Sequence, residues 1–287
     1  MQLRPTLNAA IERFTAEGVP SPRMNAELLL RFILDCDRAY LFAHPERELN
    51  ADEETRYAEA LARRATGVPT QYITGHQEFW GLDLIVSPAV LIPRPETEHV
   101  IEAVLELAHE NGCAPLHGLR VVDVGTGTGA IALALAKELS NAEIHATDIS
   151  PAALEVARAN AARHELAARI QFHETDLLAG LPQNAFDFII SNPPYVGETE
   201  EEQVQLEVRK FEPRTAVFAG PTGLEVIQRL IPQAHAALRA GGWLVFEISG
   251  TIADRILPLL SCWASVKIAD DLQGIPRVVR ARKPMHT

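Results

Sequence analysis

The sequence predicts an α/β protein with a largely parallel sheet and helices on both faces, preceded by a small helical domain and a β-hairpin. From residue 119 onward, segments rich in β-formers, such as LRVVDVG and AEIHATDI, alternate with helical segments such as SPAALEVARANAARH. This alternation is typical of βαβ units with parallel strands. The first 75 residues instead show only helical spacing, as in Ala26, Leu29, Leu30 and Ile33. That spacing indicates a separate helical domain.

Three parts follow from this division. Residues 1–75 form the helical domain, residues 76–95 a β-hairpin and linker, and residues 96–287 the α/β domain. In the middle part, EFWGLDLIVSPAVLI predicts two short strands around Gly81 that extend to about Ile92.

Local signals predict where several elements begin and end. Asp52 is the expected N-cap of the helix ADEETRYAEALARR. A helix is expected from about Thr97 to Glu110, after the PRPETE segment interrupts regular structure. The helix GLEVIQRLIPQAHAAL is expected to end at the Gly241-Gly242 pair, because glycine is common just past a helix C-terminus.

The strands expected in the α/β domain are LRVVDVG, AEIHATDI, IQFHETD, AFDFIISN, WLVFEIS, VKIAD and RVVRARK. The last of these is the most basic stretch of the chain. Its alternating pattern predicts an edge strand with solvated charges.

Bulk composition excludes several kinds of protein. The 287 residues are 47% apolar with a mean hydropathy of +0.00, which predicts a soluble globular protein. Runs such as AIALALA fall short of the roughly 18 apolar residues of a membrane span. The first residues lack the apolar core of a signal peptide, so the cytoplasm is the expected location. A net charge of −12 opposes binding to phosphate backbones, so neither membrane nor nucleic acid is an expected partner.

The metal-ligating residue types form no recognisable motif. Cys36, Cys113 and Cys262 are scattered without a CxxC pair, and the ten histidines lack HxH or HExxH spacing. Neither a disulfide framework nor a bound metal is therefore expected.

A glycine-rich segment, VGTGTGAIAL, places Gly125, Gly127 and Gly129 between a strand and a helix. Glycine there lets the backbone approach a ligand closely. The G-x-G-x-G spacing departs from the G-x-G-x-x-G dinucleotide fingerprint. Asp148 ends the next strand, where its carboxylate can accept hydrogen bonds from both hydroxyls of a ribose. A nucleoside without a pyrophosphate fits both features, which favours S-adenosylmethionine. NAD and a tight turn without a ligand are the alternatives.

Ligands in parallel sheets bind beyond the carboxyl ends of the strands, where Asp176 ends the third strand. A carboxylate at that level commonly binds the adenine edge, and Leu177 is available to pack on the base. A helix cap or turn cap is the alternative interpretation of Asp176.

The fourth strand is followed by SNPPYVG, which brings Asn192, Pro193, Pro194 and Tyr195 to the same edge. A planar nitrogen is a weak nucleophile because its lone pair is delocalised. Two acceptors, the Asn192 side-chain oxygen and the Pro193 carbonyl, would bind its two N–H groups and direct the lone pair toward an electrophilic methyl group. The prolines fix the backbone, so these acceptors are preorganised. Tyr195 can stack on the flat group, and no strong general base is needed. A plain Asn-Pro-Pro turn is the alternative.

These motifs resemble those of the class I, seven-stranded, Rossmann-like methyltransferases that use S-adenosylmethionine and act on planar nitrogen. The segments GVPTQYITGHQEFWGLDLIVSPAVLIPRPETEHV (67–100) and FEPRTAVFAGPTGLEVIQRLI narrow the resemblance. Over essentially the whole chain it is similar to the release-factor glutamine N5-methyltransferases, the PrmC/HemK family. The resemblance implies methylation of the glutamine in the Gly-Gly-Gln loop of class 1 peptide-chain release factors, with the helical domain docking that protein substrate.

The resemblance also implies the site residues. Those expected to bind the cofactor are Gly125, Thr126, Gly127, Thr128, Gly129, Asp148, Asp176, Leu177 and Asn192. Those expected to bind the substrate glutamine and to act in catalysis are Asn192, Pro193, Pro194 and Tyr195.

Two questions stay open at the level of sequence. The PRPETE segment is either a structural linker or part of the methyl-transfer pocket. The alternatives to glutamine methylation are an adenine-N6 or guanine-N2 nucleic-acid methyltransferase and a non-catalytic adapter that binds S-adenosylmethionine or a partner.

Overall fold

The computed structural model describes residues 1–110 and 118–285, so Cys113 lies outside the described residues. The chain forms two compact units. The first, here the helical unit, comprises Met1–His76 together with Gln205–Phe211. The second, the α/β unit, comprises Gln77–Val204 and Glu212–Thr287.

The helical unit is built around a small apolar core of its own. Its helices are α1 (Leu3–Ala16), α2 (Pro22–Leu34), α3 (Arg38–Ala43), α4 (Ala51–Ala65), α5 (Thr70–Thr74) and α9 (Leu206–Phe211). Ala26, Leu29, Leu30 and Ile33 of α2 are all buried, which confirms the helical spacing predicted from sequence. Tyr57 of α4 packs in the same core, and its hydroxyl donates to the Ala26 carbonyl at 3.0 Å.

The predicted cap of α4 is wrong by two residues, because Asn50 rather than Asp52 is the N-cap. The Asn50 side chain accepts from the Glu53 N–H at 2.9 Å, and the Glu53 carboxylate accepts from the Asn50 N–H at 3.0 Å. This reciprocal capping box needs a Glu three residues after the cap; Glu53 stands there for Asn50, whereas Thr55 stands there for Asp52. Asp52 lies instead in the first turn of the helix.

The segment Gln205–Phe211 joins the helical unit through α9, although it lies far along the chain. Arg64 of α4, whose side chain is only 4% exposed, forms an ion pair with Glu207 at 2.8 Å. Its Nε donates to Asn25 Oδ1 at 3.0 Å. Arg64 thus ties α9 to both α2 and α4.

The α/β unit contains a seven-stranded sheet in the order β10–β11–β9–β6–β3–β4–β5. The strands β3, β4, β5, β6 and β9 are mutually parallel, whereas β11 is antiparallel to β9 and to β10. The strands are β3 (Arg120–Val124), β4 (Glu143–Asp148), β5 (Ile170–Glu174), β6 (Phe186–Ser191), β9 (Leu238–Glu247), β10 (Ala264–Asp270) and β11 (Pro276–Arg282). The predicted fold class is confirmed.

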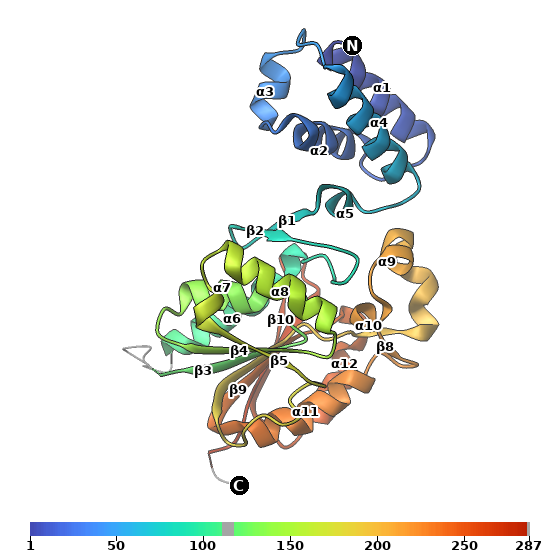
Figure 1. Ribbon diagram of the computed structural model, residues 1–287. Helices are drawn as coiled ribbons and strands as arrows, with labels where there is room; N and C mark the ends of the chain where they lie inside the picture. Colours follow the sequence, from blue (N-terminus) through green and yellow to red (C-terminus); the bar gives the residue numbers. More distant parts are fainter. Residues whose placement is uncertain (111–117, 286–287) are drawn as a thin grey trace. The chain divides into compact units, whose positions relative to one another are not determined.

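Helices cover both faces of this sheet (Figure 1). One apolar core joins α6, α7 and the β1–β2 hairpin to Val121 and its face of the sheet, and the other joins α11 and α12 to Val122 and the opposite face. The helices are α6 (Glu98–Glu110), α7 (Ala130–Glu138), α8 (Pro151–Arg163), α10 (Arg214–Val217), α11 (Glu225–Ala237) and α12 (Ala253–Ile256).

The remaining elements are short. A β-hairpin is present as predicted, although it ends seven residues before Ile92, at Ile85. These elements are β1 (His76–Phe79), β2 (Leu82–Ile85), β7 (Val196–Gly197), β8 (Phe218–Gly220), η1 (Pro95–Thr97), η2 (Ala167–Arg169), η3 (Glu198–Gln203), η4 (Gly250–Ile252) and η5 (Leu257–Leu260).

Two further predictions are wrong. Helix α11 ends at Ala237, and the Gly241-Gly242 pair lies inside β9, beside a register shift against β6. Glycines inside a strand commonly mark such irregularities. The basic strand β11 is internal, with β10 at the edge. Its alternate residues Val279 and Ala281 are buried, and the Arg280 guanidinium pairs with Glu106 of α6 at 2.8 Å. The arginines of β11 are therefore partnered rather than solvated.

The parallel strands deliver polar residues to one edge of the sheet. Val124 at the end of β3 is level with Thr147 of β4 and with Ser191 of β6. The segments that follow these three strands consequently begin side by side, which is where a ligand site is expected.

Candidate active site

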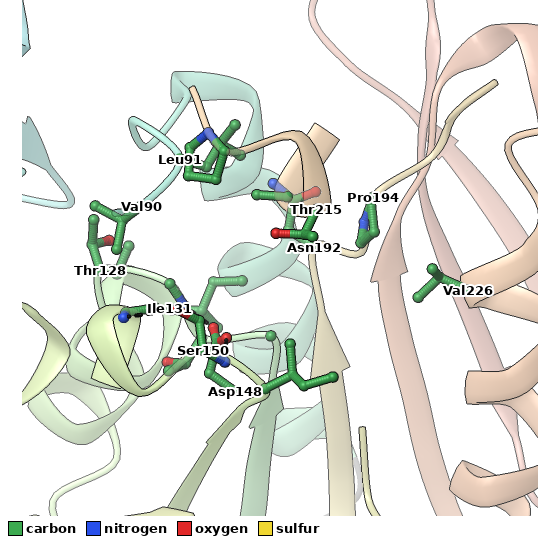
Figure 2. A pocket seen from close by; sticks show the side chains of 18 of the residues that line it. Val90, Leu91, Thr128, Ile131, Asp148, Ser150, Asn192, Pro194, Thr215 and Val226 are labelled. Atoms are coloured by element: carbon green, nitrogen blue, oxygen red, sulfur yellow. Dashed lines mark hydrogen bonds between the residues drawn. The ribbon is translucent and has the colours of Figure 1, made fainter. Parts of the chain in front are cut away.

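A cavity of about 360 Å³ lies at this edge, within the α/β unit. Its walls come from seven separate segments of that unit, near residues 89–97, 125–131, 148–153, 175–177, 192–194, 213–218 and 226–229. Figure 2 shows side chains from several of them. Figure 2 shows Asp148 and Ser150 on one side and Asn192 and Pro194 on another, with Leu91 from the segment after the hairpin nearby. The cavity thus brings together most residues of the two groups singled out from the sequence, with Gly129, Pro193 and Tyr195 outside its lining.

The cofactor loop, Gly125–Gly129, turns tightly between β3 and α7. Its three glycines have φ values of +72°, +56° and +84°, which side chains rarely adopt. A Cβ on Gly125 or Gly127 would meet no other atom within 4 Å, whereas one on Gly129 would lie 2.5 Å from Leu133 Cδ1. The first two glycines therefore leave room for a ligand, and the third permits close packing of α7.

Hydrogen bonds inside the protein occupy most N–H groups of the cofactor loop. Those of Gly125 and Thr126 donate to the Thr147 carbonyl, each at 2.9 Å, and that of Gly129 donates to the Thr126 carbonyl at 2.8 Å. The Gly127 N–H donates to the Asp148 carboxylate at 2.9 Å. The loop therefore offers a ligand close backbone approach rather than a row of free donors.

Asp148 ends β4 and lines the cavity, as predicted. Its Oδ2 accepts from Gly127 and its Oδ1 accepts from the Ser150 N–H at 2.9 Å. A carboxylate has about four lone-pair sites, so both oxygens keep acceptor capacity. Two fixed acceptors beside an open glycine loop fit a ribose with two neighbouring hydroxyls.

Asp123 lies behind the cofactor loop and was not singled out from the sequence. Its Oδ2 accepts from the Thr126 hydroxyl at 2.6 Å and from the Ala132 N–H at 3.2 Å. Its Oδ1 is buried and has no hydrogen-bond partner among the described residues. Burial raises the pKa of Asp123 to about 7, against the effect of these two hydrogen bonds. The loop is thus held by a carboxyl group that changes charge near neutral pH.

Asp176 and Leu177 both line the cavity beyond β5. Asp176 forms an ion pair with Arg229 of α11, which also lines the cavity. Leu177 has a φ of +54°, unusual for a residue with a side chain. Ile149, directly after Asp148, is 64% exposed and adds an apolar wall that the sequence analysis missed. An apolar residue right after the strand-ending Asp148 was the available signal.

The acceptor turn, Asn192–Tyr195, follows β6. Asn192 and Pro194 line the cavity, whereas Pro193 and Tyr195 are not among its lining residues. The Asn192 side-chain N–H donates to the Thr97 hydroxyl at 3.0 Å. Figure 2 shows the Asn192 side chain pointing into the cavity.

Tyr195 is bound behind the turn. Its hydroxyl donates to Glu247 Oε1 at 3.0 Å, and its ring packs against the core on the α11 side of the sheet. Burial and the Glu247 carboxylate raise the pKa of Tyr195, so its hydroxyl stays protonated at neutral pH. The stacking role of Tyr195 on a substrate stays a prediction.

The PRPETE segment is more than a linker, because Pro93 and Thr97 line the cavity. Thr97 is 4% exposed, and its hydroxyl donates to Glu247 Oε2 at 2.6 Å. Neither this role of Thr97 nor that of Glu247 was found from sequence. Their contacts join positions 95 and 150 residues apart, and no short motif carries that information.

Residues 1–110 and 118–285 lack two features that would point to other functions. In that part of the chain, no group of three or more His, Cys, Asp or Glu residues is arranged to hold a metal ion. Within the same residues, no helix is long and apolar enough to cross a membrane.

The fold and site define a class of protein. Residues 105–210, which include the cofactor loop and the acceptor turn, match the family model described as methyltransferase small domain. The structure reported as the hMettl16 catalytic domain in complex with MAT2A 3'UTR hairpin 6 has a TM-score of 0.58. That match covers 88% of this chain and 93% of the other at 19% identity, which shows a shared fold. The protein is a methyltransferase.

Relatives that match over nearly the whole chain identify the family within the methyltransferases. A release factor glutamine methyltransferase of Koribacter versatilis (strain Ellin345) is 54% identical over 285 residues, 99% of both chains. One of Moorella thermoacetica (strain ATCC 39073 / JCM 9320) is 46% identical over 280 residues, 96% of this chain and 97% of the relative. Residues 6–75 match the family model described as PrmC N-terminal domain. The chain belongs to the release factor glutamine methyltransferase family.

Proposed function

We propose that this protein transfers a methyl group from S-adenosylmethionine to the side-chain amide nitrogen, N5, of the glutamine in the Gly-Gly-Gln loop of class 1 peptide-chain release factors. The observation that carries the proposal is the Asn192 side chain. Its N–H is bound by Thr97, so its oxygen is left to accept a hydrogen bond in the cavity. The names of relatives up to 54% identical over the full chain support the substrate. Translation factors act in the cytoplasm, which is the proposed location.

The residues of one wall fit S-adenosylmethionine. The Asp148 carboxylate would accept from the ribose hydroxyls, and the open Gly125 and Gly127 would let the nucleoside lie against the backbone. Asp176 would accept from the adenine amino group, with Leu177 and Ile149 packing on the base. When bound, S-adenosylmethionine supplies an electrophilic methyl group on a positively charged sulfur.

The acceptor turn would hold the substrate nitrogen. Asn192 Oδ1, together with the carbonyl of the buried Pro193, would accept its two N–H groups. These bonds would bias the nitrogen away from planarity and turn its lone pair toward the cofactor side. Because both acceptors are fixed before the substrate arrives, little reorganisation is needed in the transition state. The proton leaves only after the nitrogen has become tetrahedral, so no strong base is required.

The helical unit is proposed to dock the release factor. None of its residues lines the cavity, yet α2 exposes Met24, Leu28 and Phe32, which are spaced four residues apart and share one face. Arg23 and Arg31 border a surface hollow beside Met24 and Leu28. Glu27 lies in the same hollow and pairs with Arg23, so the proposed contact rests on the exposed apolar stripe, the kind of surface that binds protein partners.

The test is methyl transfer from labelled S-adenosylmethionine, followed by mass spectrometry of the acceptor. The purified protein is expected to add one methyl group to the loop glutamine of a release factor. A release factor with that glutamine changed to alanine is the matched control. DNA and ribosomal RNA serve as the other arm, and salt-sensitive labelling of either nucleic acid with none on the release factor would overturn the proposal.

A further inference from the structure

Behind the acceptor turn lies a chain of hydrogen bonds in which the two middle side chains are buried and the two end side chains are half-buried. It runs from Asn192 to Thr97, from Thr97 to Glu247 and from Glu247 to Tyr195. Glu247 is 1% exposed and lies at the end of β9, near the centre of the sheet. Buried polar groups are costly unless they are bonded, so the arrangement of donors and acceptors in this chain is tightly constrained.

The direction of the bonds follows from counting hydrogens. Each oxygen of the Glu247 carboxylate accepts one bond, from Thr97 at 2.6 Å and from Tyr195 at 3.0 Å. A threonine hydroxyl has a single hydrogen, and that of Thr97 is given to Glu247. Thr97 can therefore face Asn192 only as an acceptor. The Asn192 side chain accordingly donates its NH₂ group to Thr97, and the Asn192 side-chain oxygen faces the cavity.

We propose that Thr97 and Glu247 are positioning residues of the methyl transfer, which fix the orientation of the Asn192 amide and thereby select a substrate group that carries N–H donors. A reversed amide would present N–H groups to the substrate nitrogen, and two opposed donors in a buried site are unfavourable. This inference rests on the proposed function only for the identity of the substrate. The amide orientation itself is a property of the free protein.

The charge of Glu247 maintains this direction. Burial raises the pKa of Glu247, while the bonds from Thr97 and Tyr195 and the positive charge of Arg277 oppose that shift. The neighbouring Glu96 acts in the same direction as burial. A proton on Glu247 would have to be donated to Thr97 or Tyr195, which would reverse part of the chain. Activity is therefore expected to fall as the pH drops through the raised pKa of Glu247.

Thr97→Val and Thr97→Ser form the decisive pair, since valine keeps the shape and serine keeps the hydroxyl. For Thr97→Val we expect kcat on a release factor to fall about 10- to 100-fold through misplacement of Asn192. Affinity for S-adenosylhomocysteine, measured by calorimetry, should stay within about 2-fold, because no cofactor contact is removed. Thr97→Ser should restore most of kcat. Equal kcat for Thr97→Val and the wild type, or no rescue by serine, would overturn the inference.

Glu247→Gln supplies a second, independent measurement. Thr97 and Tyr195 donate to different oxygens of Glu247, and glutamine would put an NH₂ donor in place of one of those two acceptors. We expect kcat to fall and the acid limb of the wild-type pH profile of kcat to disappear. An unchanged acid limb in an active Glu247→Gln protein would contradict the role of its charge.

A readout without substrate separates this inference from the proposed function. The side-chain NH₂ signal of Asn192, identified by its loss in Asn192→Ala, should exchange slowly with solvent in the wild type and at least about 10-fold faster in Thr97→Val. Slow exchange in both proteins would refute the positioning role even if no methylation were observed. Failure of the wild type to methylate a release factor, with the exchange difference present, would instead refute only the proposed substrate.

Discussion

The two walls of the cavity are held by different means. The cofactor loop is held mainly by its backbone: three glycines with positive φ lie within five residues, and the loop N–H groups bond to the loop itself and to the end of the neighbouring strand β4. The acceptor turn is held by side chains from distant segments, through Thr97 and Glu247. A buried carboxyl group lies behind each wall. Both oxygens of Glu247 accept hydrogen bonds, whereas Asp123 has one oxygen without a partner among the described residues.

Because the two walls are held differently, substitutions in them should change different properties of the protein. The loop depends on backbone shape, so substitutions in it should affect folding and cofactor affinity together. The turn depends on side-chain hydrogen bonds, so substitutions there should affect the rate of transfer with the cofactor still bound.

The largest effect is expected at the turn. Asn192→Ala removes a preorganised acceptor, so kcat should fall about 10²- to 10³-fold. Because the cofactor loop is untouched, the affinity for S-adenosylhomocysteine should remain near that of the wild type. Single-turnover assays and calorimetry measure the two quantities. Retention of wild-type kcat would show that the Asn192 oxygen does not bind the substrate nitrogen.

The corresponding change in the loop is Gly129→Ala. The new side chain must adopt φ near +84° and would contact Leu133 and Ala157, so the free energy of unfolding should drop by about 1–3 kcal/mol. Cofactor affinity should fall with it. Gly18→Ala is the matched control, because Gly18 also has positive φ but lies in open space after α1. If the control lowered cofactor affinity equally, the effect would not come from the loop.

Asp123, behind the cofactor loop, is expected to make the stability of the folded protein depend on pH. The folded pKa of Asp123 is about 7, against 3.8 for the ordinary side chain, so between these values the folded state binds more protons than the unfolded state. Stability from this group is therefore lost as the pH rises. As the pH rises from 5 to 8, the free energy of unfolding of Asp123→Asn should increase by about 2–3 kcal/mol relative to that of the wild type. Urea unfolding at both pH values measures this, and a constant difference would contradict the assignment.

The smallest effect is expected at the ion pair between Arg229 and Asp176, which lines the cavity and is partly exposed to solvent. Arg229→Ala frees Asp176, but the pair is about half exposed, so stability should change by less than about 0.5 kcal/mol. Affinity for S-adenosylhomocysteine should rise about 2-fold, because a released carboxylate accepts more readily from the adenine amino group. A tenfold loss would indicate instead that Arg229 itself contacts the cofactor.

The same contrast explains what sequence analysis could find. The fold class, the cofactor loop and Asp148 follow from contiguous patterns, since strands, glycines and a strand-ending acid are local features. The position of β11 inside the sheet could not be predicted, because alternation along a strand does not specify its neighbours. The Asn50 cap was accessible in principle, since Glu53 follows it by three residues.

The residues behind the acceptor turn show most clearly what could not be predicted from the sequence. Thr97 was visible only as part of PRPETE, and Glu247 only as one polar residue in the apolar strand WLVFEIS. A buried carboxylate in an inner strand requires hydrogen-bonding or charged partners, but the sequence does not identify those partners. Only the three-dimensional arrangement joins the two to Asn192 and Tyr195.

The return of Gln205–Phe211 to the helical unit has a practical consequence for protein engineering. The chain changes unit three times, near residues 76, 204 and 211, so a single cut near residue 76 yields no complete helical module. A fragment ending there would lack α9 and leave the buried guanidinium of Arg64 without Glu207. Chimaeras that exchange the helical unit between relatives must therefore transplant both pieces together, as a discontinuous cassette.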